Sequence, residues 1–423
     1  MAFSVSRTSR GLVKPFEQTP SGTLDLSVID RLFILRCNAR TLHVFRHGPE
    51  AARFIREALS KALVPYYPLA GRLKESSQGQ LQIECSGEGV WLVEATASCN
   101  LDSVNYFDNA ESETYDELLP DRNPEVDGTE PLVQMQVTQF GCGGFVIGLI
   151  FCHSICDGLG AAQFLNAVGE LARGVNHLSI LPVWRRDFSP PPPQQPTIAK
   201  LPILPPPMPN YKLEHANIDI PIHQISHLKQ QFLDSTGKIC STFEVVAATF
   251  WQQRTIAINF KQNTEVKLVF FANCRQILNP PLPEGFYGNC FYPVTITTLS
   301  DSLTQASNVE VVKLIQEAKA KLPVEFERYI KGEYLKDGDG EDPFAPPLIY
   351  TTSFISEWGR LGFNEVDYGW GPPVHVVPIQ GSSIIPVGIV GSLPLPEKGI
   401  RLMTWCVEED HRQEFIDLMM TSI

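Results

Sequence analysis

The sequence predicts an α/β protein with mixed β-sheets and flanking helices. Apolar residues recur at helical spacing in some segments and at strand spacing in others, and the two kinds of segment do not alternate strictly. A glycine turn at 141–144 also joins two strand-like runs, which indicates a hairpin. A purely parallel sheet contains no hairpins, so the sheets are expected to be mixed.

The first half of the chain contains both kinds of element. A helix is expected over 50–63, where apolar side chains recur every three or four residues. Strands are expected at 81–85, 90–94, 132–138 and 145–151. A second amphipathic helix is expected at 161–173, and Gly174 would end it.

The second half repeats this mixture after a proline-rich stretch. Helices are expected at 242–260 and 309–322, and strands at 266–273, 294–298 and 384–393. Ten of the 20 residues from Pro190 to Pro209 are proline, and such a segment favours extended polyproline structure over a packed core. We therefore predict two domains, 1–189 and 211–423, joined by a linker at 190–210.

Composition and charge exclude several classes of protein. The chain has 423 residues and a formal net charge of −13, so nucleic acid is not an expected partner. Its most apolar run, 145–152, is far shorter than the ~20 residues of a membrane helix, and no apolar secretory segment follows the first residues. We expect a soluble, cytoplasmic, monomeric protein without a membrane span.

The cysteines predict neither a disulfide framework nor a metal site. Ten are present without a C-x-x-C pair. Most lie among apolar neighbours, as Cys85 and Cys142 do, so we expect them to be buried and reduced. The group Cys152, His153 and Cys156 lacks a second pair of ligands, so no metal is expected.

The candidate for chemistry is the segment 151–160, Phe-Cys-His-Ser-Ile-Cys-Asp-Gly-Leu-Gly, between an apolar strand and a helix. His153 would project from the end of a rigid strand into a cleft, and Gly158 would permit the sharp turn. A histidine that merely closes the turn is the structural alternative. A dinucleotide-binding loop is disfavoured, because Gln163 replaces the third glycine.

The spacing His-x-x-x-Asp occurs a second time, at His215 and Asp219. This copy lacks the following glycine, and we expect no turn or helix after the strand-like residues 218–222. Because structural context is what supports a motif, only the copy at His153 is taken as a site. Neither a Gly-x-Ser-x-Gly elbow nor a P-loop is present in the sequence.

Several motifs together resemble the plant BAHD acyl-CoA-dependent acyltransferases. One is His-Ser-Ile-Cys-Asp-Gly at 153–158, and another is Asp-Tyr-Gly-Trp-Gly at 367–371, where the family usually has Asp-Phe-Gly-Trp-Gly. Around them stand Leu-Ser-Val-Ile-Asp at 26–30, Tyr-Tyr-Pro-Leu-Ala-Gly-Arg-Leu at 66–73 and Phe-Tyr-Gly-Asn at 286–289. The motifs follow the family's order, so the resemblance covers nearly the whole chain.

The resemblance implies a chloramphenicol acetyltransferase-like fold, with two similar domains around a central solvent channel. Acyl-CoA would enter from one face as a co-substrate, with no permanently bound cofactor, and the acceptor would enter from the other. His153 would act as the general base in a ternary complex. An acyl-cysteine at Cys152 or Cys156 is the rival, disfavoured because neighbouring side chains of a strand point to opposite faces.

The same resemblance assigns roles around this histidine. Asp157 would point away from the channel and pair with Arg275, and Asp367, followed by Gly369, would hold its own loop. Trp370 offers an indole N–H to the oxyanion, with plain packing as the alternative.

The family also places CoA near the start of the helix at 242, where Ser241 and Thr242 would present N–H groups, with simple capping as the alternative. Lys238 is a nearby cation.

Within the family, the segment 358–373 is similar to a group of aromatic and taxoid-type acyltransferases, and the segments 270–275 and 286–293 are similar to monolignol acyltransferases. An aromatic acyl group passed to an alcohol, such as p-coumaroyl or p-hydroxybenzoyl transfer to a monolignol, is therefore expected. An amine N-acyltransferase, or an acetyl or benzoyl transferase for a terpenoid or benzyl-type alcohol, is the alternative.

Overall fold

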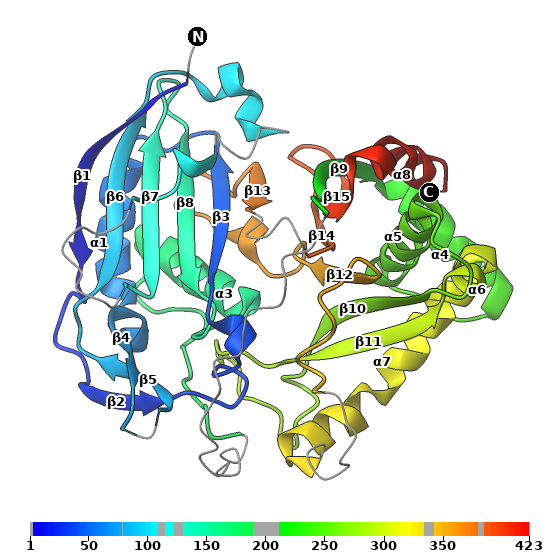
Figure 1. The fold of residues 1–423 in the computed structure, drawn as a ribbon. Helices are drawn as coiled ribbons and strands as arrows, with labels where there is room; N and C mark the ends of the chain where they lie inside the picture. The colour runs from blue at the N-terminus through cyan, green and yellow to red at the C-terminus, as the bar shows by residue number, and fades with distance from the viewer. Residues whose placement is uncertain are drawn as a thin grey trace.

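The computed structural model describes residues 3–77, 79–108, 115–121, 130–188, 211–333, 342–379 and 385–422. Two six-stranded mixed sheets form two domains that lie side by side (Figure 1). The mixed α/β architecture predicted from the sequence is therefore confirmed. The linker predicted at 190–210 lies outside the described residues, so the domain boundaries stay predictions.

The first sheet has the strand order β1-β6-β7-β8-β3-β13. Its strands are β1 (Val5–Val13), β3 (Asn38–Phe45), β6 (Val90–Ala97), β7 (Val133–Gln139), β8 (Phe145–Cys152) and β13 (His375–Pro378). β6 and β7 run parallel, and the other neighbours are antiparallel. Helices α1 (Ala51–Ala62) and α3 (Gly158–Ala172) pack together behind this sheet (Figure 1).

The second sheet has the order β11-β10-β12-β14-β15-β9. Its strands are β9 (Glu214–Pro221), β10 (Glu265–Asn273), β11 (Phe291–Leu299), β12 (Thr352–Glu357), β14 (Val387–Ser392) and β15 (Gly399–Val407). Its helices are α4 (Ile222–Thr236), α5 (Thr242–Ile258), α6 (Ser300–Gln305), α7 (Asn308–Ile330) and α8 (Glu409–Ser422). A small sheet, β2 (Gly22–Asp25), β5 (Leu81–Cys85) and β4 (Arg72–Glu75), lies beside the first domain.

The two halves of the chain exchange segments. β13 comes from the second half, yet it pairs antiparallel with β3, and it forms the edge of the first sheet. In the other direction, Ile29 and Leu35 from the first half are buried in the core of the second domain. The junction between the domains is therefore built by both halves of the chain.

Four local expectations need correction. The helix expected to stop at 322 continues to Ile330 with Pro323 inside it, because Phe326 and Tyr329 beyond the proline are buried in the core. The helix expected from 161 begins at Gly158. Cys142 is exposed because it lies in the tight turn between β7 and β8.

The fourth correction concerns the second copy of the motif. A helix, α4, does follow the strand β9 that contains His215 and Asp219. The two segments nevertheless differ, because His215 packs its ring on Trp405 and Asp219 pairs with Arg401. Across the described residues, no helix is long and apolar enough to cross a membrane.

Candidate active site

His153 lies directly after the last residue of β8, in the turn that leads into α3. The strand pairing of β8 with β3 continues into this turn, since the His153 N–H donates to the carbonyl of Cys37 at 2.9 Å. The hydroxyl of Ser154 donates to the carbonyl of Leu35 at 2.9 Å. The histidine is thus anchored at the end of a buried strand, as the sequence predicts.

A cavity of about 50 Å³ adjoins His153. Its lining comes from β3, β8, the start of α3 and the segment after β12: Ala39, Thr41, Leu149, Phe151, His153, Cys156, Asp157, Gly158, Ala161, Trp358 and Phe363. The wall is mostly apolar, and Trp358 and Phe363 come from the second half of the chain. Sequence reasoning missed Thr41, Trp358 and Phe363 as lining residues. Alternating side chains on β3 would have signalled Thr41, but that strand was not predicted.

Asp157 is turned toward Arg275. Its two carboxylate oxygens accept hydrogen bonds from Arg275 Nη1 and Nη2, each at 2.8 Å, and both side chains are close to 90% buried. Asp157 Oδ1 also accepts from the Gly160 N–H at 3.1 Å, which caps α3. The structure therefore contains the ion pair that the resemblance implied, and the carboxylate is occupied by it.

Gly158 does not have the role that the sequence suggested. Its backbone lacks a positive φ, and it is the first residue of α3. A side chain here would instead meet Leu361 Cδ1 at 2.6 Å. Glycine is favoured at this position by close packing between the two halves of the chain.

Two cysteines flank His153, and burial changes their chemistry. Burial raises the pKa of the Cys152 thiol to about 11, and it raises the pKa of Cys156 well above the ordinary value. Both thiols are therefore protonated at neutral pH. Because the thiolate is the nucleophile, neither is poised to attack a thioester.

Thr41 brings a polar group to the apolar wall. Its hydroxyl lies 2.9 Å from Nε2 of His43, which is two residues further along β3. His43 is 1% exposed, and burial lowers its pKa to about 3. The imidazole is therefore neutral, so it holds the Thr41 hydroxyl in place without bringing a charge to the cavity.

The loop at 367–371 is closed on itself. Asp367 Oδ1 accepts hydrogen bonds from the N–H groups of Gly369 and Gly371, at 2.7 and 2.9 Å. Both glycines have a positive φ, +111° and +93°, which residues with a side chain rarely adopt. Asp367 thus shapes its loop and does not line the cavity at His153.

Trp370 packs away from this cavity. Its ring makes edge contacts with Phe54 of α1 and Phe145 of β8, with centroid distances of 5.6 and 6.0 Å. It is not among the residues that line the cavity at His153. The structure does not bring Trp370 together with His153, and its contacts agree with the packing alternative.

The start of α5 is capped by its own residues. Ser241 Oγ accepts from the Glu244 N–H at 3.2 Å, and Glu244 Oε2 accepts from the Ser241 N–H at 2.9 Å. Lys319 pairs with the same glutamate. Ser241 is therefore occupied in capping, as the sequence alternative held, whereas Thr242 is half-buried and Lys238 is exposed.

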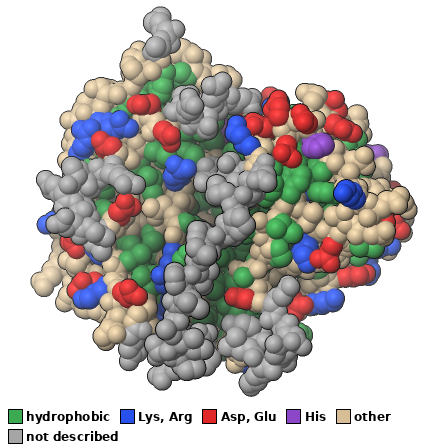
Figure 2. Space-filling view, in the orientation of Figure 1, with side chains coloured by type: hydrophobic (Ala, Val, Ile, Leu, Met, Phe, Trp, Pro, Cys, Tyr) green, Lys and Arg blue, Asp and Glu red, His purple; other side chains and the backbone are tan. Residues whose placement is uncertain are grey.

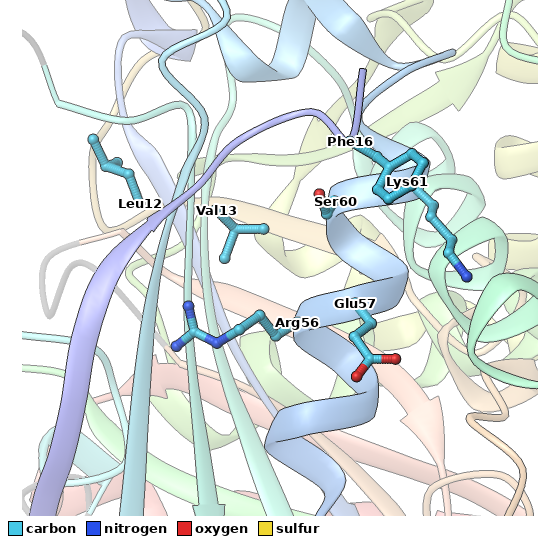
Figure 3. Close-up of a pocket in the computed structure, with 7 residues that line it drawn as sticks. All are labelled: Leu12, Val13, Phe16, Arg56, Glu57, Ser60 and Lys61. Carbon is cyan, nitrogen blue, oxygen red and sulfur yellow. The ribbon is translucent and has the colours of Figure 1, made fainter.

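A larger hollow lies elsewhere on the first domain. It has a volume of about 470 Å³ and lies between the end of β1 and α1, with Val13, Phe16, Arg56 and Lys61 on its wall (Figure 3). No histidine or cysteine lines it.

On the face shown in Figure 2, acidic side chains gather where β9 and α8 lie. Among the described residues, no group of three His, Cys, Asp or Glu side chains could hold a metal ion.

Solved structures share this fold. The chain superposes on vinorine synthase with a TM-score of 0.76, 20% sequence identity and coverage of 99% of this chain and 98% of that one. It superposes on TRI101 of F. sporotrichioides, complexed with coenzyme A and T-2, with a TM-score of 0.72, 14% identity and coverage of 93% and 97%. At these identities the likeness establishes the fold.

Sequence relatives extend the likeness to the family. The chain is 44% identical to Acyl transferase 4 of Oryza sativa subsp. japonica, covering 98% of each chain. It is 38% identical to myricetin 3-O-glucosyl 1,2-rhamnoside 6'-O-caffeoyltransferase AT2 of Crocosmia x crocosmiiflora, covering 99% of each. It is 34% identical to 3'-N-debenzoyl-2'-deoxytaxol N-benzoyltransferase of Taxus canadensis, covering 100% of this chain and 97% of that one.

The Transferase family matches residues 3–390, nearly the whole chain. The relatives are named as acyltransferases, and the likeness covers nearly their whole length. The fold around His153 is also the fold of a protein solved in complex with coenzyme A. The chain therefore belongs to the Transferase family of BAHD acyltransferases, and it is an acyl-CoA-dependent acyltransferase with acyl-CoA as its co-substrate.

Proposed function

We propose that this enzyme transfers an aromatic acyl group from CoA to an alcohol, with His153 as the general base. The observation that carries the proposal is the cavity at His153. There the imidazole is the one lining group suited to accept a proton, because Asp157 is held by Arg275 and Cys156 is a protonated thiol.

The chemistry needs no covalent enzyme intermediate. The neutral imidazole of His153 accepts the proton of the acceptor hydroxyl while the hydroxyl oxygen attacks the thioester carbonyl. The new C–O bond forms, the C–S bond breaks, and the leaving thiolate of CoA takes the proton from the imidazolium. The histidine returns to its neutral form, and CoA and the ester leave.

An aromatic donor and a hydroxylated substrate suit the cavity wall. Phe151, Trp358 and Phe363 offer aromatic surface, and Thr41 offers a hydroxyl held by neutral His43. The Crocosmia relative is named as a caffeoyltransferase, which supports a hydroxycinnamoyl donor. We propose a monolignol as the acceptor, with a p-coumaroyl or p-hydroxybenzoyl group transferred.

The remaining assignments concern CoA and the Asp367 loop. We propose that the phosphates of CoA lie near the start of α5, where Thr242 offers a backbone N–H and Lys238 an exposed cation. Ser241 would contribute by holding the helix terminus through its cap. Asp367, Gly369 and Trp370 would keep the channel wall in shape.

The direct test is His153→Ala. Loss of the base should reduce turnover by about 100-fold or more, measured as CoA release with p-coumaroyl-CoA and a monolignol. His215→Ala is the matched control, because His215 belongs to the second His-x-x-x-Asp copy and packs on Trp405 in the other sheet. Near-normal turnover in His153→Ala would remove the general-base role.

An amine acceptor is the second candidate, because the Taxus relative is named as an N-benzoyltransferase. A panel of aromatic and acetyl CoA thioesters should be offered to alcohols and amines, with products identified by mass spectrometry. Ester products from aromatic donors are expected. Amide products alone would replace the O-acyl assignment, and ester formation from acetyl-CoA only would replace the aromatic donor.

A further inference from the structure

The His153 imidazole receives no orienting hydrogen bond at its buried Nδ1 atom from the described residues. Asp157, four residues on, is committed to Arg275 and to the cap of α3. Without a hydrogen bond at Nδ1, the place of the imidazole depends on the packing of the cavity wall and on the backbone that bears it, so contacts that hold this backbone help to position the proposed base.

Two carbonyl groups of the turn are held from outside. Asn289 Nδ2 donates to the His153 carbonyl at 2.8 Å. Arg186 Nη2 donates to the Ile155 carbonyl at 2.7 Å. Both donors come from segments distant in sequence, 136 and 31 residues away. The turn is thus held by hydrogen bonds at two carbonyl groups, that of His153 and that of Ile155, two residues further on.

A single buried carboxylate joins these two donors. Asp30 is 0% exposed. Its Oδ1 accepts from the N–H of Asn289 at 3.1 Å and from Asn289 Nδ2 at 2.8 Å. Its Oδ2 accepts from the N–H and hydroxyl of Ser27, at 3.0 and 2.7 Å, and lies 3.4 Å from Arg186 Nε.

We propose that Asp30, Asn289 and Arg186 form a positioning ring for His153. The ring runs from the His153 carbonyl through Asn289, Asp30 and Arg186 to the Ile155 carbonyl, and the turn itself closes it. Its members are positioning residues, because they act on the base through its backbone. This assignment rests on the proposed function, in which His153 is the base.

Burial makes the ring rigid. The side chains of Arg186 and Asp30 are 3% and 0% exposed, so their charges compensate each other away from water. The guanidinium also lies against the rings of Trp184 and Phe286, at 4.3 and 5.0 Å from their centroids. With so little freedom, the ring can hold the turn in one geometry.

The ring also joins the two domains. Asp30, Arg186 and the histidine turn belong to the first half of the chain, whereas Asn289 belongs to the second. The Asp157–Arg275 pair spans the same junction, and Arg275 Nη2 donates to the carbonyl of Gly288, next to Asn289. Two residues of the second half, Asn289 and Arg275, therefore bind the turn that carries the base.

Asn289→Ala tests the ring. It removes the donor to the His153 carbonyl and leaves the imidazole and Asp157 in place. Because a displacement of about 1 Å can cost 100-fold in rate, we expect kcat to fall about 10- to 100-fold. KM for the acyl-CoA should change less than threefold. The C2–H signal of His153, identified in the NMR spectrum by its absence in His153→Ala, should shift or broaden.

Gln252→Ala is the matched control. Gln252 is also a buried amide that donates to two backbone carbonyls, those of Leu303 and Ala306, but it lies in the core of the second domain. It should lose stability while keeping kcat and the His153 signal. This separates the cost of losing a buried amide from the loss of positioning.

The outcomes are decisive in each direction. Unchanged kcat and an unchanged His153 signal in folded Asn289→Ala would overturn the ring, whereas His153→Ala alone decides the general-base role. If Asn289→Ala does not fold while Gln252→Ala does, the ring serves folding and the positioning role is wrong. A parallel loss of kcat in both variants would also refute it.

Discussion

The hydroxyl of Tyr368 lies in an aromatic core without a hydrogen-bond partner. The side chain is 2% exposed, and its ring makes an edge contact with Phe45 at 5.5 Å between centroids. Its oxygen is buried with no partner among the described residues, and burial raises its pKa. The family motif that this segment resembles has phenylalanine here, so Tyr368 adds a polar atom among aromatic rings.

Tyr368→Phe should therefore stabilise the protein. Removing an unsatisfied buried hydroxyl relieves a desolvation cost of about 1 kcal/mol or more, and the ring contacts stay. Urea unfolding followed by circular dichroism should give a higher midpoint with the same slope, and turnover should stay within about twofold. A lower midpoint would mean that the hydroxyl is satisfied and useful.

At the scale of elements, the start of α3 is packed against the second half of the chain. A side chain at Gly160 would overlap the backbone carbonyl oxygen of Tyr287. A side chain at Gly158 would instead meet a methyl group of Leu361, which can rotate away. Two glycines two residues apart are thus required to very different degrees.

Gly160→Ala should cost more than Gly158→Ala. Overpacking against a fixed backbone carbonyl costs about 1–3 kcal/mol, and the displaced helix would pull the His153 turn with it. For Gly160→Ala, the midpoint temperature of thermal unfolding and kcat should both fall. For Gly158→Ala we expect a smaller loss of stability. Equal losses would mean that the Tyr287 loop yields as easily as the Leu361 side chain.

At the scale of the whole molecule, two buried histidines flank the seam between β3 and β13. His43 pairs with Val376 across this seam, and His375 pairs with Val44. Burial lowers the pKa of His43 to about 3. Burial and then the nearby Arg401 lower the pKa of His375 to about 4. Both imidazoles are therefore neutral where the second half of the chain completes the first sheet.

Acid should weaken this seam. A histidine in the unfolded chain has a pKa near 6.5. Below that pH the unfolded chain binds protons at these two positions, whereas His43 and His375 stay neutral in the folded protein. Stability should be full above about pH 7 and fall between pH 6.5 and about 4, by about 1.4 kcal/mol per histidine at pH 5.5. Urea unfolding at a series of pH values should show this slope, and His375→Asn should lessen the loss at pH 5.5 by about 1.4 kcal/mol. An unchanged slope in that variant would contradict the assignment.

Much of the site follows from short stretches of sequence. Strand, turn and helix around His153 are visible in a single window, because apolar spacing and glycine turns report on backbone geometry within a few residues. The strand β5 was predicted at its observed bounds, and α1 and β8 within one residue. The motifs, taken in order along the chain, led to the BAHD resemblance, which the family match confirms.

Other features depend on contacts between distant segments. Pro323 should end a helix by local rules, yet α7 continues because its later turns are buried in the core. Trp370 belongs to a family motif, but only its ring contacts with Phe54 and Phe145 show where the ring lies. Trp358 gave no local signal that it lines the cavity at His153.

The sequence by itself determined the α/β class, the candidate base His153 and the acyltransferase family. The class is read from local periodicity, the candidate base from the strand, turn and helix around His153, and the family from the resemblance of several motifs in order along the chain. Only the tertiary structure decided that β13 completes the first sheet, and that Asn289 and Arg186 grip the turn of the base. The reason is physical: burial and pairing between segments that are distant in the sequence depend on how the two sheets meet, and no local pattern encodes that meeting.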